Sequence, residues 1–173
     1  MIETFINHTN KVHTLINSSD LTSIKESKDI IIEAILNKKN IYVAGNGGSF
    51  AIADHFICDF AKRVSEKTSF PVRIYHLSIH ASLMSAVSND LHYDESYSYQ
   101  AERYLDKNDV VILISSSGSS KNILNAFEVA KSRKCKIISL YGFNINSNLK
   151  DSDSYLYINS DSYEEVEDCH HIF

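Results

Sequence analysis

The chain has 173 residues, of which 43% are hydrophobic and 23% charged, so it is long enough for a core and has a globular composition. A net charge of −5 and the absence of a long basic run argue against nucleic-acid binding. No apolar run reaches the length of a membrane-spanning helix, and the N-terminus does not resemble a signal peptide.

Helical spacing of apolar residues predicts a first helix over 1–17 and a second over 21–37. The second carries more apolar surface than one stripe requires. Such a helix packs either under a sheet or in a subunit interface, and we favour the interface. Short runs of β-branched and aromatic residues predict strands at 41–44, 72–77, 110–114, 136–141 and 155–158.

Helices are predicted between these strands at 50–64, 79–87, 94–104 and 121–133. A last helix follows the Ser162-x-x-Glu165 capping box and runs to the end of the chain. Strands that alternate with helices in this way indicate an α/β fold with a parallel sheet. The three cysteines (Cys58, Cys135 and Cys169) form no Cys-x-x-Cys motif and are typical of reduced thiols in a cytoplasmic protein.

A glycine-rich turn, Gly45-Asn46-Gly47-Gly48-Ser49, follows the first predicted strand. Glycine allows positive φ and close approach to a ligand, and the turn opens onto a helix N-terminus, which favours an anion. A phosphate ester is one interpretation of the turn. A βα turn that needs glycine for steric reasons alone is the other, and the turn by itself does not decide between them.

A serine-rich turn from Ser115 to Ser120 follows the strand at 110–114. Ligands of parallel sheets lie at the carboxyl ends of strands, and hydroxyls with backbone amides suit a phosphate monoester. Alone, this turn is better explained by an N-cap loop that binds nothing, but two such turns after two strands favour phosphate binding. Their glycine spacing matches neither a P-loop nor a dinucleotide fingerprint, so no nucleotide cofactor is predicted.

Histidines and carboxylates share helix faces at two places. His55 and Asp59 are four residues apart on one predicted helix, and Glu167 and His171 repeat that spacing on the last one. Such a pair can be an acid–base pair, half a metal site or a plain surface contact, and taken alone the surface contact is favoured. If the two helices meet, the four side chains could form one divalent-metal site.

The glycine turn, His55-Phe56, Arg63 and the serine turn together resemble the SIS (sugar isomerase) domain, and most of all the phosphoheptose isomerases. This resemblance implies a three-layer sandwich with a five-stranded parallel sheet flanked by helices, similar to flavodoxin and Rossmann folds. It also implies a homotetramer built on two N-terminal helices. Residues 1–38 would then serve oligomerisation and 39–173 would form the SIS domain.

The resemblance also implies roles for individual residues. Asp59 and His171 are the candidate acid–base groups, and His55 matches a zinc ligand of some members. One zinc ion per subunit would be held by His55, Asp59, Glu167 and His171. The expected substrate-binding residues are Asn46, Gly47, Ser49, Arg63, Asn89, Asp90, Ser115, Ser116, Ser117, Ser120 and Glu167.

The chain departs from the family pattern at several of these positions. Asp59 replaces a catalytic Glu, His80 an Asp, Glu164 an Asp and Glu167 a Gln. A second catalytic His is expected at position 175, beyond Phe173, and His171 lies one turn before it. Shortening Glu to Asp withdraws the carboxylate by one methylene, and a misplacement of about 1 Å can cost on the order of a hundredfold in rate.

The activity implied is an aldose–ketose isomerisation of sedoheptulose 7-phosphate to D-glycero-D-manno-heptose 7-phosphate through an enediol, feeding heptose synthesis for surface polysaccharide. Two alternatives stay open. One is a non-catalytic SIS module that binds a sugar phosphate or a protein partner. The other is an isomerase of a different phosphosugar, with His80 reshaping the pocket.

Overall fold

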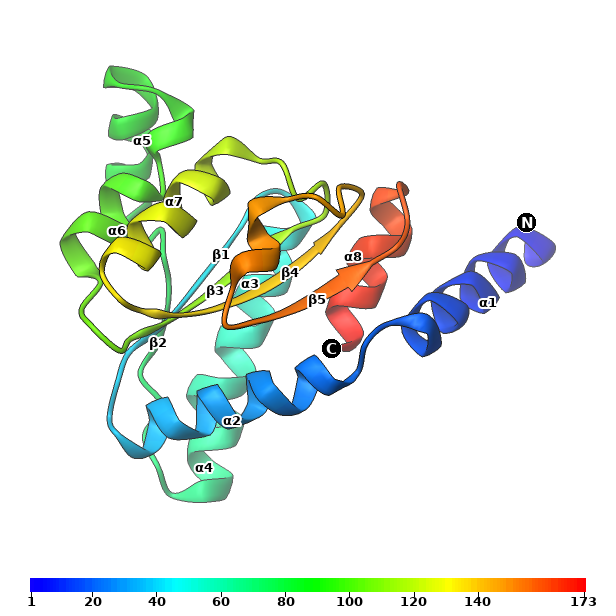
Figure 1. The fold of residues 1–173 in the computed structure, drawn as a ribbon, viewed down its shortest axis with the longest axis horizontal. Coiled ribbons are helices and arrows are strands. Elements are labelled where there is room, and N and C mark those ends of the chain that lie inside the picture. The colour runs from blue at the N-terminus through cyan, green and yellow to red at the C-terminus, as the bar shows by residue number, and fades with distance from the viewer.

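The computed structural model describes residues 1–173, and its centre is one parallel sheet with the strand order β2-β1-β3-β4-β5 (Figure 1). The sheet continues from β1 to β2 on one side and to β3 on the other. The carboxyl ends of β1 and β3 therefore flank the topological switch point, where α/β sheets bind ligands. The strands are β1 (Ile41–Gly45), β2 (Ile74–His76), β3 (Val110–Ser115), β4 (Lys136–Gly142) and β5 (Ser154–Ile158).

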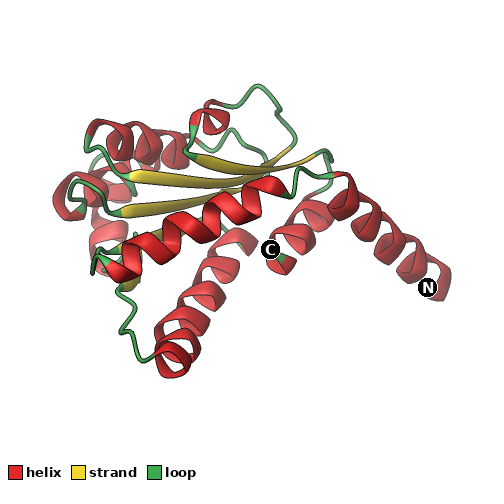
Figure 2. Ribbon diagram, turned by 60° about the horizontal axis from the view of Figure 1, so that its bottom comes forward, coloured by secondary structure: helices red, strands yellow, loops and turns green.

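Helices cover both faces of the sheet, which is why every residue of β1 and β3 is buried (Figure 2). The α-helices are α1 (Ile2–Ser18), α2 (Thr22–Leu36), α3 (Gly48–Cys58), α4 (Ser65–Thr68), α5 (Ala81–Asp90), α6 (Ser98–Tyr104), α7 (Lys121–Ser132) and α8 (Tyr163–Ile172). Shorter elements are a π-helical segment η1 (Asp59–Val64) and two 3₁₀ turns, η2 (Tyr93–Glu95) and η3 (Asn148–Asp151).

Alternating residues of the strands divide the core into two layers. Tyr42, Val111 and Ile137 face α6 and α7, where they meet Ala101 and Phe127. The intervening residues Ile41, Val43 and Ile112 face α2 and α3. The predicted three-layer α/β sandwich is therefore confirmed. The glycine turn and the serine turn both lie at the carboxyl ends of the strands.

The two N-terminal helices take different places. Helix α2 packs under the sheet against β3 and β5, whereas α1 packs on α8 and projects from the body of the molecule (Figure 1). Ile24, Ile32 and Leu36 of α2 stay exposed. The expectation that α2 has more apolar surface than one contact needs is thus met, although its inner face is covered by the sheet.

Several predicted boundaries were wrong. The helix expected at 50–64 begins at Gly48 and continues as a π segment and α4 to Thr68, beyond its expected end. The strand expected at 72–77 is only Ile74–His76, because Pro71 lacks an N–H group and the Val72 N–H donates to Ser65 Oγ (3.0 Å). The helix expected at 94–104 begins at Ser98, after the 3₁₀ turn.

The predicted capping box forms only in part. Ser162 Oγ accepts a hydrogen bond from the Glu165 backbone N–H (3.3 Å), but the Glu165 carboxylate accepts one from Ser160 Oγ (2.5 Å) instead of reaching back to Ser162.

The turns at the two ends of the strands use different residues where the backbone bends sharply. All five glycines lie at the carboxyl edge, in the turns after β1 and β3 and at the end of β4. The turns that lead into β1, β3 and β4 place Lys38, Asn108 and Lys134 at positive φ (54°, 67° and 60°). Non-glycine residues in this conformation carry steric strain.

Candidate active site

The glycine and serine turns meet at the switch point between β1 and β3. Gly47 has φ +56°, which allows the chain to reverse into α3. The Oγ atoms of Ser49 and Ser116, one from each turn, lie 3.3 Å apart and are buried. The structure thus brings together two turns that are far apart in the sequence.

The serine turn presents its hydroxyls at the start of α7. Ser115 Oγ donates a hydrogen bond to Ser120 Oγ (3.3 Å), and Ser117 Oγ accepts hydrogen bonds from the backbone N–H and the hydroxyl of Ser119 (3.3 and 3.1 Å). Ser120 is the N-cap of α7, yet its side chain makes no capping bond. The hydroxyls of Ser115 and Ser120, which bond to each other, are available to an anion at this helix N-terminus.

Asn46 is held by a partly buried hydrogen-bond network. Its side-chain amide exchanges hydrogen bonds with that of Asn122 (2.8 and 3.0 Å), and its Oδ1 also accepts one from Tyr93 OH (2.8 Å). Tyr97 OH donates to the carbonyl of Gly45 just before the turn. Tyr93 and Tyr97 therefore brace the glycine turn, a role that the sequence analysis did not predict.

Glu167 reaches from α8 to both turns. Its Oε1 accepts a hydrogen bond from Ser116 Oγ (3.4 Å), and its carboxylate lies so close to Gly48 that a Cβ atom there would overlap it. The carboxylate therefore lies between the two turns predicted to hold the substrate, where it can accept hydrogen bonds from sugar hydroxyls.

Helices α3 and α8 also meet at a pair of histidines. His55 Nδ1 and His171 Nε2 are 2.7 Å apart, and their rings are nearly perpendicular (81°). His55 Nε2 lies 3.7 Å from Oδ2 of Asp59, the next residue along this face. The two helices therefore meet, which was the condition for a site shared between them.

The four predicted metal ligands do not form one metal site. No three His, Cys, Asp or Glu side chains lie in a group that could hold a metal ion. Two nitrogen ligands of tetrahedral zinc lie roughly 3.3 Å apart for Zn–N bonds of about 2.05 Å. The imidazole nitrogens are closer than that, at 2.7 Å, and the Glu167 carboxylate turns toward Ser116 instead of the histidines. This arrangement does not fit zinc.

Arg63, Asn89 and Asp90 lie apart from the two turns. Arg63 is exposed in the π segment and forms no ion pair, and Asn89 donates to its neighbour Asp90 (2.8 Å) at the end of α5. His80 is the exposed N-cap residue of α5, and its ring lies 6.5 Å from that of Tyr104. Within this single chain, none of them makes a side-chain hydrogen bond or ion pair with the glycine or serine turn.

Two histidines, the partly buried His76 and the buried His170, were assigned no function by the sequence analysis. His76 stacks on Phe50 (3.9 Å between ring centroids), and burial lowers its pKa to about 4. His170 is 2% exposed, neither of its ring nitrogens has a side-chain or water partner, and burial lowers its pKa to about 4. Their location at β2 and α8 depends on tertiary packing, for which the sequence offered no periodic signal.

Comparison with known proteins agrees with this architecture. Residues 4–142 match the family model of the SIS domain. A phosphoheptose isomerase from Helicobacter pylori (strain ATCC 700392 / 26695) is 34% identical over 148 residues, covering 86% of this chain and 77% of the relative. One from Aliarcobacter butzleri (strain RM4018) is 32% identical over 174 residues, covering 100% of this chain and 90% of the relative.

Solved structures share the whole fold. A phosphoheptose isomerase from Francisella tularensis superposes with a TM-score of 0.89, covering 99% of this chain and 91% of the other, at 23% identity. The enzyme from Neisseria gonorrhoeae gives 0.86, covering 99% and 90%, at 22% identity. From the family match and the identities above 30%, this chain belongs to the SIS domain family and, within it, to the phosphoheptose isomerases.

Proposed function

We propose that this chain isomerises sedoheptulose 7-phosphate to D-glycero-D-manno-heptose 7-phosphate through an enediol. The observation that carries the proposal is the convergence of four features on one edge of the sheet: the glycine turn, the serine turn, the Glu167 carboxylate and the His55–His171 pair. Family membership supplies the reaction class. The site supplies groups that suit each part of such a substrate.

Each part of the substrate has a matching group. The serine turn and the N-terminus of α7 suit the phosphate, because hydroxyls and backbone N–H groups bind an anion there. Glu167 suits the sugar hydroxyls, which donate hydrogen bonds to a carboxylate. Asp59 and His171 both lie next to His55 and are the candidate acid–base groups for moving a proton between neighbouring carbons.

Turnover of sedoheptulose 7-phosphate in D₂O, followed by NMR, tests this proposal. An enediol isomerase forms the aldose product with deuterium at C2, because the abstracted proton exchanges with solvent. Binding without product or exchange would reduce the chain to a sugar-phosphate-binding module. Product from another phosphosugar but not from this heptulose would reassign the substrate.

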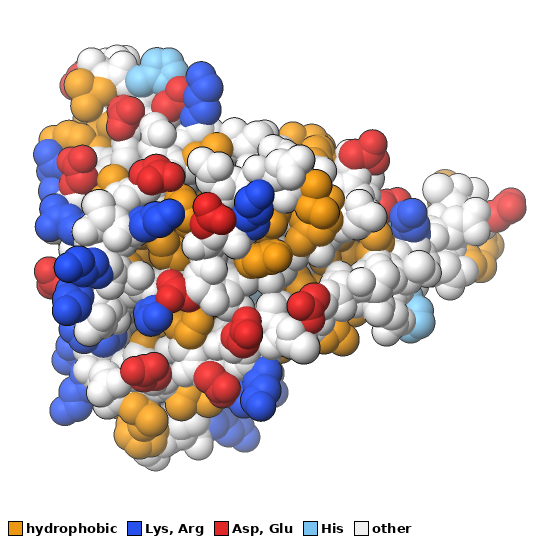
Figure 3. All heavy atoms as spheres, viewed as in Figure 1, with side chains coloured by type: hydrophobic (Ala, Val, Ile, Leu, Met, Phe, Trp, Pro, Cys, Tyr) orange, Lys and Arg blue, Asp and Glu red, His pale blue; other side chains and the backbone are white.

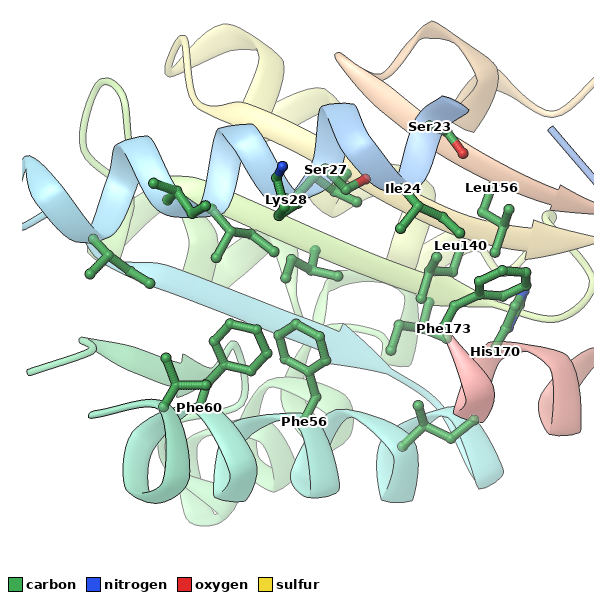
Figure 4. Close-up of a pocket in the computed structure, with 18 of the residues that line it drawn as sticks. Ser23, Ile24, Ser27, Lys28, Phe56, Phe60, Leu140, Leu156, His170 and Phe173 are labelled. Carbon is green, nitrogen blue, oxygen red and sulfur yellow. The ribbon is translucent and has the colours of Figure 1, made fainter. Parts of the chain in front are cut away.

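The proposed enzyme self-associates, and we favour a homotetramer. The supporting features are two unpartnered apolar surfaces. An apolar cavity of about 490 Å³ lies between α2 and the α3–η1–α4 helix; 16 of its 21 lining residues are hydrophobic, and Figure 4 shows Phe56 and Phe60 on one wall and Ile24 on the other. The free end of α1 exposes Ile2 and Phe5 (78% and 72%), and apolar side chains are visible there in Figure 3.

The apolar cavity and the exposed apolar residues of α1 could fill each other's need for an apolar partner. The cavity needs an apolar occupant, and the projecting half of α1 is an amphipathic helix with no partner in its own chain. A groove and a projecting helix on the same chain favour association between copies. No helix of the chain is long and apolar enough to cross a bilayer.

A further inference from the structure

Asn122 is a buried amide in the first turn of α7. It is the second residue of the helix, directly after the serine turn, and is only 2% exposed. Asparagine is a poor helix former, and a buried amide costs free energy unless its polar groups are bonded. Its Nδ2 donates to Asn46 Oδ1 (3.0 Å) and to Ser96 Oγ (3.3 Å), and its Oδ1 accepts from Asn46 Nδ2 (2.8 Å). A residue that the helix itself does not favour is thus bonded to the neighbouring glycine turn.

The partner of Asn122 lies where the backbone does little to fix a side chain. Asn46 is flanked by Gly45 and Gly47, and its own side chain is partly exposed. Tertiary hydrogen bonds therefore set the direction of its amide. The amides of Asn46 and Asn122 are joined by two reciprocal bonds, and Tyr93 OH donates to Asn46 Oδ1 as well (2.8 Å). These bonds come from α7 and η2, so two other elements hold the Asn46 side chain in place.

Only one polar group of the Asn46 side chain is left for a ligand. A side-chain amide has two acceptor lone pairs and two N–H donors. Asn122 and Tyr93 fill both lone pairs of Asn46 Oδ1, and Asn122 takes one of the two N–H groups. In this arrangement Asn46 can donate one hydrogen bond to a bound ligand but cannot accept one.

We infer that Asn122 is a positioning residue of the substrate site, which holds the Asn46 amide so that it offers the substrate one N–H donor and no acceptor. The inference rests on the proposed isomerase function. A ketose phosphate carries acceptor oxygens on its carbonyl and phosphate groups, which suit such a donor, whereas its hydroxyls can donate to Glu167. Because the donor is oriented before the substrate arrives, no free energy is spent on orienting it during the reaction.

Asn122→Asp tests this role with a side chain of nearly the same shape. A carboxylate has only acceptors, so one of its oxygens would oppose Asn46 Oδ1 or its rotated equivalent. Protonation gives the carboxyl an O–H donor and restores the paired geometry. The variant should therefore lose kcat/KM on the order of a hundredfold at about pH 8, and should recover to within about tenfold of the wild type at about pH 5.5.

The introduced carboxyl should titrate in this range because burial raises its pKa above the usual value of about 3.9. The nearby acidic groups, Asp94 and Glu95 of η2 and Glu167 beside the serine turn, raise the pKa further. Lys121, which pairs with Asp94 (3.7 Å), opposes them. These groups are the same in the wild type, so its own pH profile is the reference.

Asn125→Asp is the matched control. Asn125 lies one turn further along α7, and its Nδ2 donates to the carbonyl of Asp94 (3.0 Å). This substitution also places a carboxyl against η2, but it leaves the bonds to the glycine turn intact. Its kcat/KM should stay within about twofold of the wild type at both pH values.

A double-mutant cycle with Asn46→Ala separates positioning from a direct contact. If Asn122 acts through the Asn46 amide, Asn122→Asp should lower kcat/KM little further once that amide has been removed. Losses that multiply would mean that Asn122 acts on the substrate by another route. Initial rates with sedoheptulose 7-phosphate give kcat/KM, and urea unfolding at each pH verifies that the variants are folded.

Tyr93→Phe provides a second test if Asn122→Asp does not fold at the higher pH. Tyr93 is 46% exposed, so its hydroxyl can be removed without a buried cavity, and one of the two bonds to Asn46 Oδ1 is lost. We expect kcat/KM to fall about fivefold in the wild type and to stay unchanged in the Asn46→Ala background. Equal kcat/KM for Tyr93→Phe and the wild type would count against the inference.

The remaining outcomes are distinct. Full kcat/KM for Asn122→Asp at about pH 8, no recovery of the folded variant at about pH 5.5, or multiplying losses in the cycle would overturn this inference while leaving the isomerase function in place. Wild-type chain that does not turn over sedoheptulose 7-phosphate would overturn the proposed function and this inference with it.

Discussion

The carboxylate of Glu167 lies against the Cα atom of Gly48, in the space that a side chain at residue 48 would fill. Position 48 is therefore glycine because α8 reaches across the first turn of α3, and not because the backbone there is unusual. Gly47, one residue earlier, is the opposite case: its φ is +56° and a Cβ atom would meet no neighbour.

These two glycines should respond differently to alanine. Gly48→Ala should push Glu167 away from Ser116 and lower kcat/KM about tenfold or more, with stability kept or improved because alanine favours a helix. Gly47→Ala should instead lower the free energy of unfolding by about 1–2 kcal/mol. Urea unfolding and initial rates on both variants make the comparison. Equal kcat/KM for Gly48→Ala and wild type would remove Glu167 from the substrate site.

The serine turn should contribute to substrate affinity more than to turnover. Ser120→Ala removes a hydroxyl that makes no helix-capping bond, so the fold should be retained. Loss of one hydrogen bond to a charged phosphate should raise KM on the order of tenfold with kcat little changed. Ser132→Ala, near the far end of α7, is the control. Steady-state kinetics with inorganic phosphate as competitor measures the effect, and an unchanged KM would argue against phosphate binding at this turn.

Chelation should have little effect on the reaction. The His55–His171 distance of 2.7 Å is too short for two zinc ligands, so protein treated with EDTA and freed of metal should keep most of its turnover. Metal analysis of the treated protein verifies the removal. A loss of turnover that is restored by zinc alone would show that the four side chains rearrange into a metal site.

Self-association should depend on the free end of α1. Phe5→Asp puts a charge on its exposed apolar face and should shift the protein to a smaller species, measured by light scattering after size exclusion. Asn10→Asp introduces the same charge at another exposed position of α1 and serves as the control. An unchanged mass for Phe5→Asp would place the subunit contacts elsewhere.

Burial of His170 should make stability depend on pH. Its pKa is lowered from 6.5 to about 4 because the charged imidazole would lose its hydration inside the protein. The unfolded chain therefore binds the proton more readily, and this contribution is complete above pH 6.5 and is lost as the pH falls toward 4, by on the order of 3 kcal/mol. Denaturant titrations between these pH values should show the loss, and His170→Phe should reduce it. If the free energy of unfolding fell equally with pH in the wild type and in His170→Phe, the effect would belong to other groups.

The layers of the fold were predictable because their signals are local. The apolar run Val110–Ile114 could only be a strand buried on both faces, and the glycine and serine turns mark the ends of two parallel strands. The π segment at Asp59–Val64 was missed, since its apolar spacing resembles that of an α-helix and tertiary packing decides between the two. The orientation of Glu167 was missed for a similar reason, because a rotamer depends on contacts with Gly48 and Ser116 that the sequence does not reveal.

The turns at the amino ends of the strands offer positions at which the protein can be stabilised. Lys38 and Lys134 hold a left-handed backbone in turns that lead into β1 and β4, away from every proposed substrate contact. Replacing each lysine with glycine would relieve roughly 1 kcal/mol of steric strain, partly offset by the greater freedom of glycine in the unfolded chain. Thermostability and catalytic power can thus be engineered separately in this scaffold, since they reside at opposite ends of the same strands.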